Sequence, residues 1–127
     1  MRGIWPAIAL LVAVSGCMAL PGAQAPKDAV ATRIMTEAEF RQAVVGRRLM
    51  LRDAGSFVIL SDGSLWGNDD TGPVEGSWHW ERGAWCVVVR PPGGRAIEDC
   101  QHWETLGNGF RATRRRGAGS SYYLPVG

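Results

Sequence analysis

Few of the features that identify enzymes or nucleic-acid-binding proteins occur in this 127-residue sequence. No G-x-G-x-x-G loop leads into a helix, so the usual dinucleotide-binding unit is excluded. There is no H-x-x-x-H or C-x-x-C spacing for a zinc site and no nucleophile elbow. With Arg2 removed, 13 basic and 12 acidic side chains remain, and this balance does not indicate a nucleic-acid partner. We therefore predict no catalytic, cofactor-binding or metal-binding residues.

Long hydrophobic runs are also scarce, and the one that stands out lies at the N-terminus. Arg2 precedes the apolar run Ile4–Val14, which small residues follow. This pattern is typical of an export signal. A membrane-spanning helix needs about 20 apolar residues, whereas the stretch Ile4–Leu20 is shorter, contains Pro6 and has no basic flank at its far end. We therefore predict a signal peptide that is cleaved.

Two sites for processing this signal compete. Ala23-Gln24-Ala25 matches a small-x-small cleavage motif, but Pro26 would follow the cut and is poorly tolerated there because it lacks an N–H and fixes φ. Val14-Ser15-Gly16-Cys17 resembles the lipobox of bacterial lipoproteins, in which the cysteine is acylated and becomes the new N-terminus. We favour lipidation at Cys17, which would anchor the protein in an envelope membrane through its acyl chains. Cleavage near Ala25 would instead leave a soluble periplasmic protein.

The rest of the chain divides into a tether and one domain. The signal with its lipobox covers residues 1–17. Residues 18–33 are rich in Ala, Pro and Gly and are expected to form a flexible tether. Residues 34–127 are enough for a single small domain.

One helix is expected at the start of this domain. Thr36 and Glu39 have the spacing of a capping box, in which each caps a backbone N–H of the first turn. Phe40 and Val44 then lie on one helical face, and Gly46 is suited to the C-cap. We predict a short helix from about Glu37 to Val45.

After this helix, short alternating segments are separated by turn residues. We expect about eight strands, which are Leu49–Asp53, Ser56–Ser61, a strand from Leu65, Val74–Glu81, Trp85–Arg90, Glu98–Leu106, Phe110–Arg115 and Ser120–Leu124. Their connections are too short for parallel crossovers, so the fold class is mainly β, with an antiparallel meander. Such a meander forms a small barrel or a sandwich, and we favour the barrel because closure removes exposed edges.

Cysteine is rare as well, and its three positions fit an exported protein. If Cys17 is lipidated or removed, Cys86 and Cys100 are left to pair in an oxidising compartment. A hairpin centred on Gly93 places these two residues opposite each other, close enough for a disulfide. The closed loop has about 15 residues, so the bond should stabilise the fold by about 3 kcal/mol.

A family resemblance rests on motifs in the second half of the chain. Residues 74–86 read V-E-G-S-W-H-W-E-R-G-A-W-C, residues 99–101 read D-C-Q, and Phe110–Gly117 follows. From about Glu37 to Leu124 the chain resembles a family of small exported proteins common in alphaproteobacteria. The resemblance implies that the two cysteines pair.

Members of that family often carry the label dihydrodipicolinate reductase. A nicotinamide reductase needs a Gly-rich loop between a strand and a helix. Here Gly117-Ala118-Gly119 leads into an expected strand, and the chain is too short for a cofactor domain and a substrate domain. We interpret the label as a misannotation.

Tryptophan is abundant, and five residues of this type follow the signal: Trp66, Trp78, Trp80, Trp85 and Trp103. They either fill the core or line a cavity for one small apolar ligand, and we favour the core. Trp78 and Trp80 share one face of a strand and are expected inside. One of Trp85 and Trp103 is a candidate for the outer surface, where an exposed tryptophan would indicate a binding surface.

A set of titratable residues, His79, His102, Glu98, Asp99 and Glu104, could form a metal or acid–base cluster. Because their spacing matches no metal motif, we interpret the two histidines as surface residues. A triad assembled in space stays an alternative.

Two polar runs have simple explanations. Arg114-Arg115-Arg116 could bind anionic lipid headgroups, but we favour a solvated turn at a strand end. Asn68-Asp69-Asp70 lacks the ligand spacing of a calcium loop and is expected to form an Asx-type turn.

Taken together, these features favour a non-enzymatic envelope protein. Its partners would be the membrane, through the lipid anchor, and an unknown protein or small apolar ligand. A protease inhibitor built on a small disulfide-bonded barrel is an alternative by analogy of fold and size. An enzyme, including the reductase of the label, is the other alternative and would need perturbed titratable groups that converge in a pocket.

Overall fold

The computed structural model describes residues 25–127, and the predicted signal peptide, including Cys17, lies outside this range. The described elements are β1 (Thr32–Arg33), α1 (Glu37–Ala43), β2 (Arg48–Leu51), β3 (Gly55–Ile59), β4 (Ser64–Asp69), β5 (Gly72–Glu81), β6 (Ala84–Arg90), β7 (Ile97–Leu106), β8 (Gly109–Thr113), the 3₁₀ turn η1 (Arg115–Gly117) and β9 (Ser121–Pro125).

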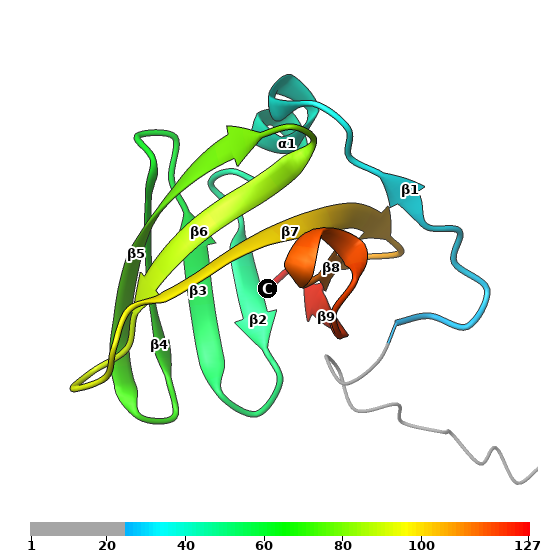
Figure 1. Cartoon of the computed structure of the whole chain (residues 1–127). Helices are drawn as coiled ribbons and strands as arrows, with labels where there is room; N and C mark the ends of the chain where they lie inside the picture. Colours follow the sequence, from blue (N-terminus) through cyan, green and yellow to red (C-terminus); the bar gives the residue numbers. More distant parts are fainter. Residues whose placement is uncertain (1–24) are drawn as a thin grey trace, which may run out of the picture.

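Strands β2 to β9 form an almost closed antiparallel barrel (Figure 1). Each strand pairs with the next one along the chain. The last strand returns to the first, because Leu49 and Val126 form an antiparallel bridge and the Gly127 N–H donates to the Arg48 carbonyl at 2.9 Å. The predicted small antiparallel barrel is confirmed.

The helix α1 lies across one end of the barrel (Figure 1). As expected, the Thr36 hydroxyl accepts from the Glu39 N–H at 3.2 Å. The Glu39 carboxylate in turn accepts from the Met35 N–H at 3.2 Å. The helix ends at Ala43, two residues earlier than predicted, because the chain turns at Gly46 (φ 85°) to bond with β3. No helix in residues 25–127 is long and apolar enough to cross a membrane.

The side chain of Phe40 connects this helix to the barrel core. It is fully buried, and its ring lies 5.3–6.0 Å from the rings of Trp78, Trp80, Trp85 and Trp103. Aromatic pairs at these distances stabilise a core beyond their area burial. Phe40 and the tryptophans therefore fill the barrel at the end that α1 covers.

Strand pairing decides which tryptophans point inward. Trp85 lies directly opposite Trp80 in the β5–β6 pair, and directly opposed residues share a face of the sheet. Trp85 and Trp103 are 3% and 0% exposed, so the expectation that one of them lies outside was wrong. Among the tryptophans of residues 25–127, the exposed one is Trp66, at 53%, and it does not belong to the core.

The disulfide forms as the register predicted. Cys86 and Cys100 are directly paired across β6 and β7, with their Cα atoms 3.9 Å apart. Both face outward, because their neighbours Trp85 and Gln101 face the lumen of the barrel. The bond therefore joins the two strands from the outer side.

The N-terminal end of the described chain is attached to the barrel. Thr32–Arg33, at the end of the predicted tether, forms β1 and pairs with Thr105 and Glu104 of β7. Ile34 is buried, and its N–H donates to the Trp103 carbonyl at 2.9 Å.

The strand predicted from Phe110 to Arg115 ends at Thr113 instead. Arg115 and Arg116 belong to η1 and have φ values of 52° and 50°. The Asp99 carboxylate accepts from the Arg115 N–H at 3.1 Å, which holds this turn against β7. The local sequence pattern does not reveal this hydrogen bond to Asp99 on β7, so it predicts a longer strand.

Candidate ligand-binding site in the barrel lumen

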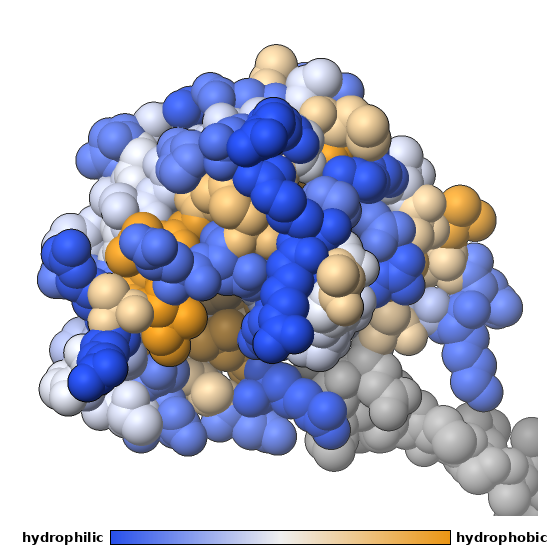
Figure 2. Space-filling model, viewed as in Figure 1, coloured by the Kyte–Doolittle hydropathy of each residue, from blue (hydrophilic) through white to orange (hydrophobic). Residues whose placement is uncertain are grey.

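The barrel encloses a cavity of about 310 Å³ at the end that α1 does not cover. Its apolar lining comes from inward positions of β2 to β6, which are Leu51, Phe57, Leu65, Val74, Val87 and Val89. Figure 2 shows the molecule hollowed below β7, with hydrophobic groups in the hollow and hydrophilic groups at its border. A largely apolar, concave site with a few polar groups is typical of small-molecule binding.

Two glycines shape the apolar wall. Gly67 lies between Phe57 and Val74 at an inward position, and Gly76 lies opposite Leu65. A Cβ atom at Gly67 would come within 2.7 Å of the Phe57 Cα atom, and one at Gly76 within 2.4 Å of a backbone oxygen. Glycine in a strand permits such close approach of backbones, so these positions allow the sheet to bend around the lumen.

The opposite wall, from β7 to β9, carries a polar network around Gln101. Gln101 is the one polar residue that is fully buried in residues 25–127, at 5% exposure. Its Oε1 accepts from the Tyr122 hydroxyl at 2.8 Å and from Trp103 Nε1 at 3.3 Å. Its Nε2 donates to the Asp99 carboxylate at 3.2 Å. This buried amide is therefore satisfied on both sides, as a core polar group must be.

Tyr122 stays protonated in this setting. Burial raises the pKa of its phenol to about 12, although the bond to Gln101 and the nearby Arg114 act in the opposite direction. The Arg114 guanidinium lies over the Tyr122 ring at 4.5 Å, a cation–π arrangement. Arg114 itself is exposed and lines the cavity, so it marks the mouth.

Trp85 supplies an unpaired polar atom to the same region. Its ring lines the cavity, and its buried Nε1–H has no hydrogen-bond partner within residues 25–127. Buried donors without a partner are rare in native proteins because each one costs free energy. The N–H is enclosed by protein atoms, so Trp85 contributes its ring to the cavity wall and not an accessible donor.

A second hollow, of about 660 Å³, lies on the outer face of the sheet around Trp66. Strand pairing aligns Arg48, Val58, Trp66, Glu75 and Arg90 in one row across β2 to β6. In this outer groove, the exposed ring of Trp66 therefore lies between the charged side chains of Arg48 and Glu75. This outer groove is larger than the lumen cavity, but charged side chains line it, so the more apolar lumen is the stronger candidate for an apolar ligand.

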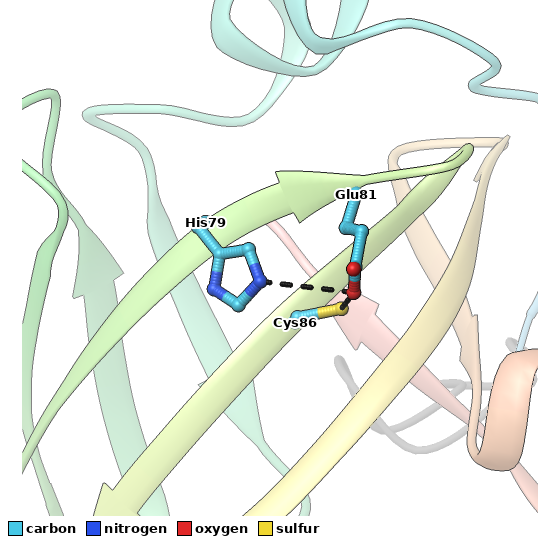
Figure 3. A group of neighbouring side chains, drawn as sticks. All are labelled: His79, Glu81 and Cys86. Carbon is cyan, nitrogen blue, oxygen red and sulfur yellow. Dashed lines mark hydrogen bonds and ion pairs between the residues drawn. The ribbon is translucent and has the colours of Figure 1, made fainter.

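Within the described part of the chain, one cluster of potential metal ligands occurs, on the outer face at His79, Glu81 and Cys86 (Figure 3). The His79 Nε2 atom is 3.9 Å from a Glu81 carboxylate oxygen. The Cys86 sulfur is bonded to Cys100, so it cannot act as a thiolate ligand. Arg116 also pairs with Glu81 at 3.0 Å. We therefore assign no metal to this cluster.

The other titratable residues that the sequence singled out do not converge. Asp99 is on the inward side of β7, where it bonds with Gln101, whereas His102 is half-buried two strand positions from Cys100 on the outer side. Burial, and then Arg33 and Arg116, lower the pKa of His102. Glu104 forms a two-pronged ion pair with Arg111, and Glu98 is exposed.

The arginine run is divided among three different surroundings. Arg114 lies at the cavity mouth, and Arg115 is exposed in η1. Arg116 packs on the disulfide, 3.6 Å from the Cys100 sulfur, and pairs with Glu81.

Between β4 and β5, the Asp69 carboxylate accepts from the Thr71 N–H at 2.8 Å, which is the expected Asx-type turn.

Sequence reasoning missed the polar wall of the lumen. The alternation of Gln101 with Trp103 on β7 places the amide on the core face, and this signal was available in the sequence. The position of Tyr122 and Arg114 beside Gln101 depends on how β7, β8 and β9 pair, which the sequence does not display.

Comparison with known proteins gives no further assignment. No family model, no curated protein and no solved structure matches the chain. The resemblance to the exported alphaproteobacterial family therefore stays a prediction.

Proposed function

We propose that this chain is a non-enzymatic binding module that takes a small apolar molecule into the lumen of its barrel. The observation that carries the proposal is the cavity of about 310 Å³, with an apolar wall on β2 to β6 and a polar wall on β7 to β9. Pockets of this order of size hold small ligands. The covered end, plugged by Phe40, gives the cavity a floor, and the other end gives it an entrance.

We further propose that the module works in a bacterial envelope, attached to a membrane through Cys17. The support is the predicted export signal and lipobox, together with a disulfide that suits an oxidising compartment. Intact mass of the membrane-extracted protein tests the anchor. Acylation at Cys17 supports it, and an unmodified chain that begins at Pro26 contradicts it.

The binding proposal is tested with N-phenyl-1-naphthylamine, an uncharged dye that fluoresces in apolar surroundings. We expect the full chain to bind one dye molecule per barrel. Val89→Phe should weaken binding by about tenfold or more, about 1.4 kcal/mol, because Val89 lines the cavity and the larger ring fills it. Fluorescence titration provides the measurement.

The matched control is Val88→Phe on the same strand. Val88 pairs with Ser77 and Glu98 on the outer side of the sheet, so this variant should bind the dye as the parent chain does. Equal binding by the parent chain, Val88→Phe and Val89→Phe would show that the dye does not enter the lumen, and the proposal would then fail.

A further inference from the structure

The polar wall of the lumen has more free donors than free acceptors. Within residues 25–127, both hydrogen-bonding ends of Gln101 are engaged, and the Tyr122 hydroxyl proton is directed to Gln101. The Trp85 Nε1–H has no partner, but protein atoms enclose it. The Arg114 guanidinium makes a single hydrogen bond there, to the Ser120 hydroxyl at 2.9 Å, so most of its donors remain free.

Strand register places Trp85, Gln101 and Arg114 at successive positions across three neighbouring strands. Trp85 is directly paired with Gln101 across β6 and β7. The β7–β8 pair ends with His102 opposite Thr113, so the next residue, Arg114, follows on the side of Gln101. Trp85 and Arg114 therefore flank Gln101, and all three line the cavity.

The carboxylates nearest to this wall already accept hydrogen bonds from the protein. Asp99 accepts from Gln101 and from the Arg115 N–H. Asp69 lines the cavity from β4, on the other wall, and accepts from the N–H and the hydroxyl of Thr71. The wall formed by Trp85, Gln101 and Arg114 thus carries one cation, while the facing wall is mostly apolar and has Ser56, Asn68 and Asp69 as its polar members.

We propose that the ligand of the lumen is a carboxylate-headed amphiphile, with its head on Arg114 at the mouth and its hydrocarbon part against the apolar side chains of β2 to β6. This inference rests on the proposed function of the lumen. A carboxylate is an acceptor-only group. Hydrogen bonds to it from a guanidinium are charge-assisted and stronger than those to a neutral oxygen. The apolar wall would cover the chain of such a molecule.

The test compares decanoate, methyl decanoate and decan-1-ol, which share one hydrocarbon chain, by calorimetric titration of the full chain. Decanoate should bind at least about tenfold more tightly than decan-1-ol, the difference expected from a hydrogen bond to a charged group. Arg114→Gln should abolish most of this preference, because decanoate should lose far more affinity than decan-1-ol. Arg115→Gln, one residue away and exposed, should change neither affinity.

Methyl decanoate tests the charge of the head. It keeps a carbonyl oxygen but carries no negative charge, so it should bind about as weakly as decan-1-ol, because only decanoate forms charge-assisted hydrogen bonds with a guanidinium.

The outcomes separate this inference from the function on which it rests. If the naphthylamine dye enters the lumen but decanoate and decan-1-ol bind equally, the carboxylate assignment is overturned and the lumen function stands. If decanoate is preferred and Arg114→Gln keeps that preference, the head lies elsewhere and the inference is also overturned. If no compound enters the lumen, the proposed function fails first.

Discussion

At the scale of single residues, Tyr122 shows how the barrel tunes a side chain. Its phenol is buried beside a satisfied amide, and burial outweighs the favourable Arg114 cation in setting the pKa at about 12. A charged phenolate is disfavoured in an apolar setting. The hydroxyl therefore remains a donor to Gln101 over the whole range in which the protein is expected to function.

This pKa predicts a loss of stability at alkaline pH. The unfolded chain releases the phenolic proton near pH 10, whereas the folded chain holds it to about pH 12. The unfolded state then binds fewer protons, so the free energy of unfolding should fall between about pH 10 and pH 12. Urea unfolding at pH 9 and at pH 11 measures the change.

Tyr122→Phe is the comparison for this titration, because it removes the ionisable group and keeps the ring. The variant should lose less stability than the parent chain between the two pH values, although it also loses the bond to Gln101. Tyr123→Phe keeps the buried phenol of Tyr122, so it should still lose stability over this range. An identical alkaline loss in all three proteins would contradict the buried, neutral phenol.

Residue-level prediction from sequence worked where alternation decided the outcome. Trp78 was placed inside and His79 outside from their positions on one strand, and the structure confirms both. The prediction failed for Trp85, Trp103 and Trp66. Whether each of these side chains faces the core or the solvent depends on how its strand pairs with the neighbouring strands. Pairing of Trp85 with Trp80 is a tertiary fact that no local pattern contains.

At the scale of elements, the β6–β7 hairpin is the best-predicted part of the molecule. The loop of Pro and Gly residues around Gly93 marks the centre of this hairpin. A hairpin with that centre pairs Cys86 with Cys100, as the structure shows. The end of β8 was predicted less well. Arg115 and Arg116 adopt positive φ values that arginine rarely takes, and Asp99 and Glu81 hold them there.

The disulfide makes a prediction at this scale. Cys86→Ala with Cys100→Ala removes a bond that spans 14 positions in sequence, and the free energy of unfolding should fall by about 3 kcal/mol. Urea unfolding measures the difference. Reduction of the parent chain should reproduce it, and an unchanged unfolding midpoint in both cases would contradict a structural role for the bond.

At the scale of the whole molecule, closure of the barrel creates the candidate site. The contact near Leu49 between β2 and the C-terminal end of the chain closes the meander into a barrel. The helix α1 covers one end of this barrel, and a cavity remains in the rest of the lumen. The number of strands and their antiparallel order could be predicted from turn spacing. The cavity could not, because it is the space left when inward side chains from eight strands meet.

The most direct test of the lumen site is the behaviour of individual indole N–H signals during the dye titration. In ¹⁵N-labelled full chain, assigned with single Trp→Phe variants, the Trp85 signal should shift as N-phenyl-1-naphthylamine is added, because Trp85 lines the cavity. The Trp66 signal, from the outer groove, should stay in place. A shift of Trp66 with an unchanged Trp85 would contradict the account and assign binding to the outer face.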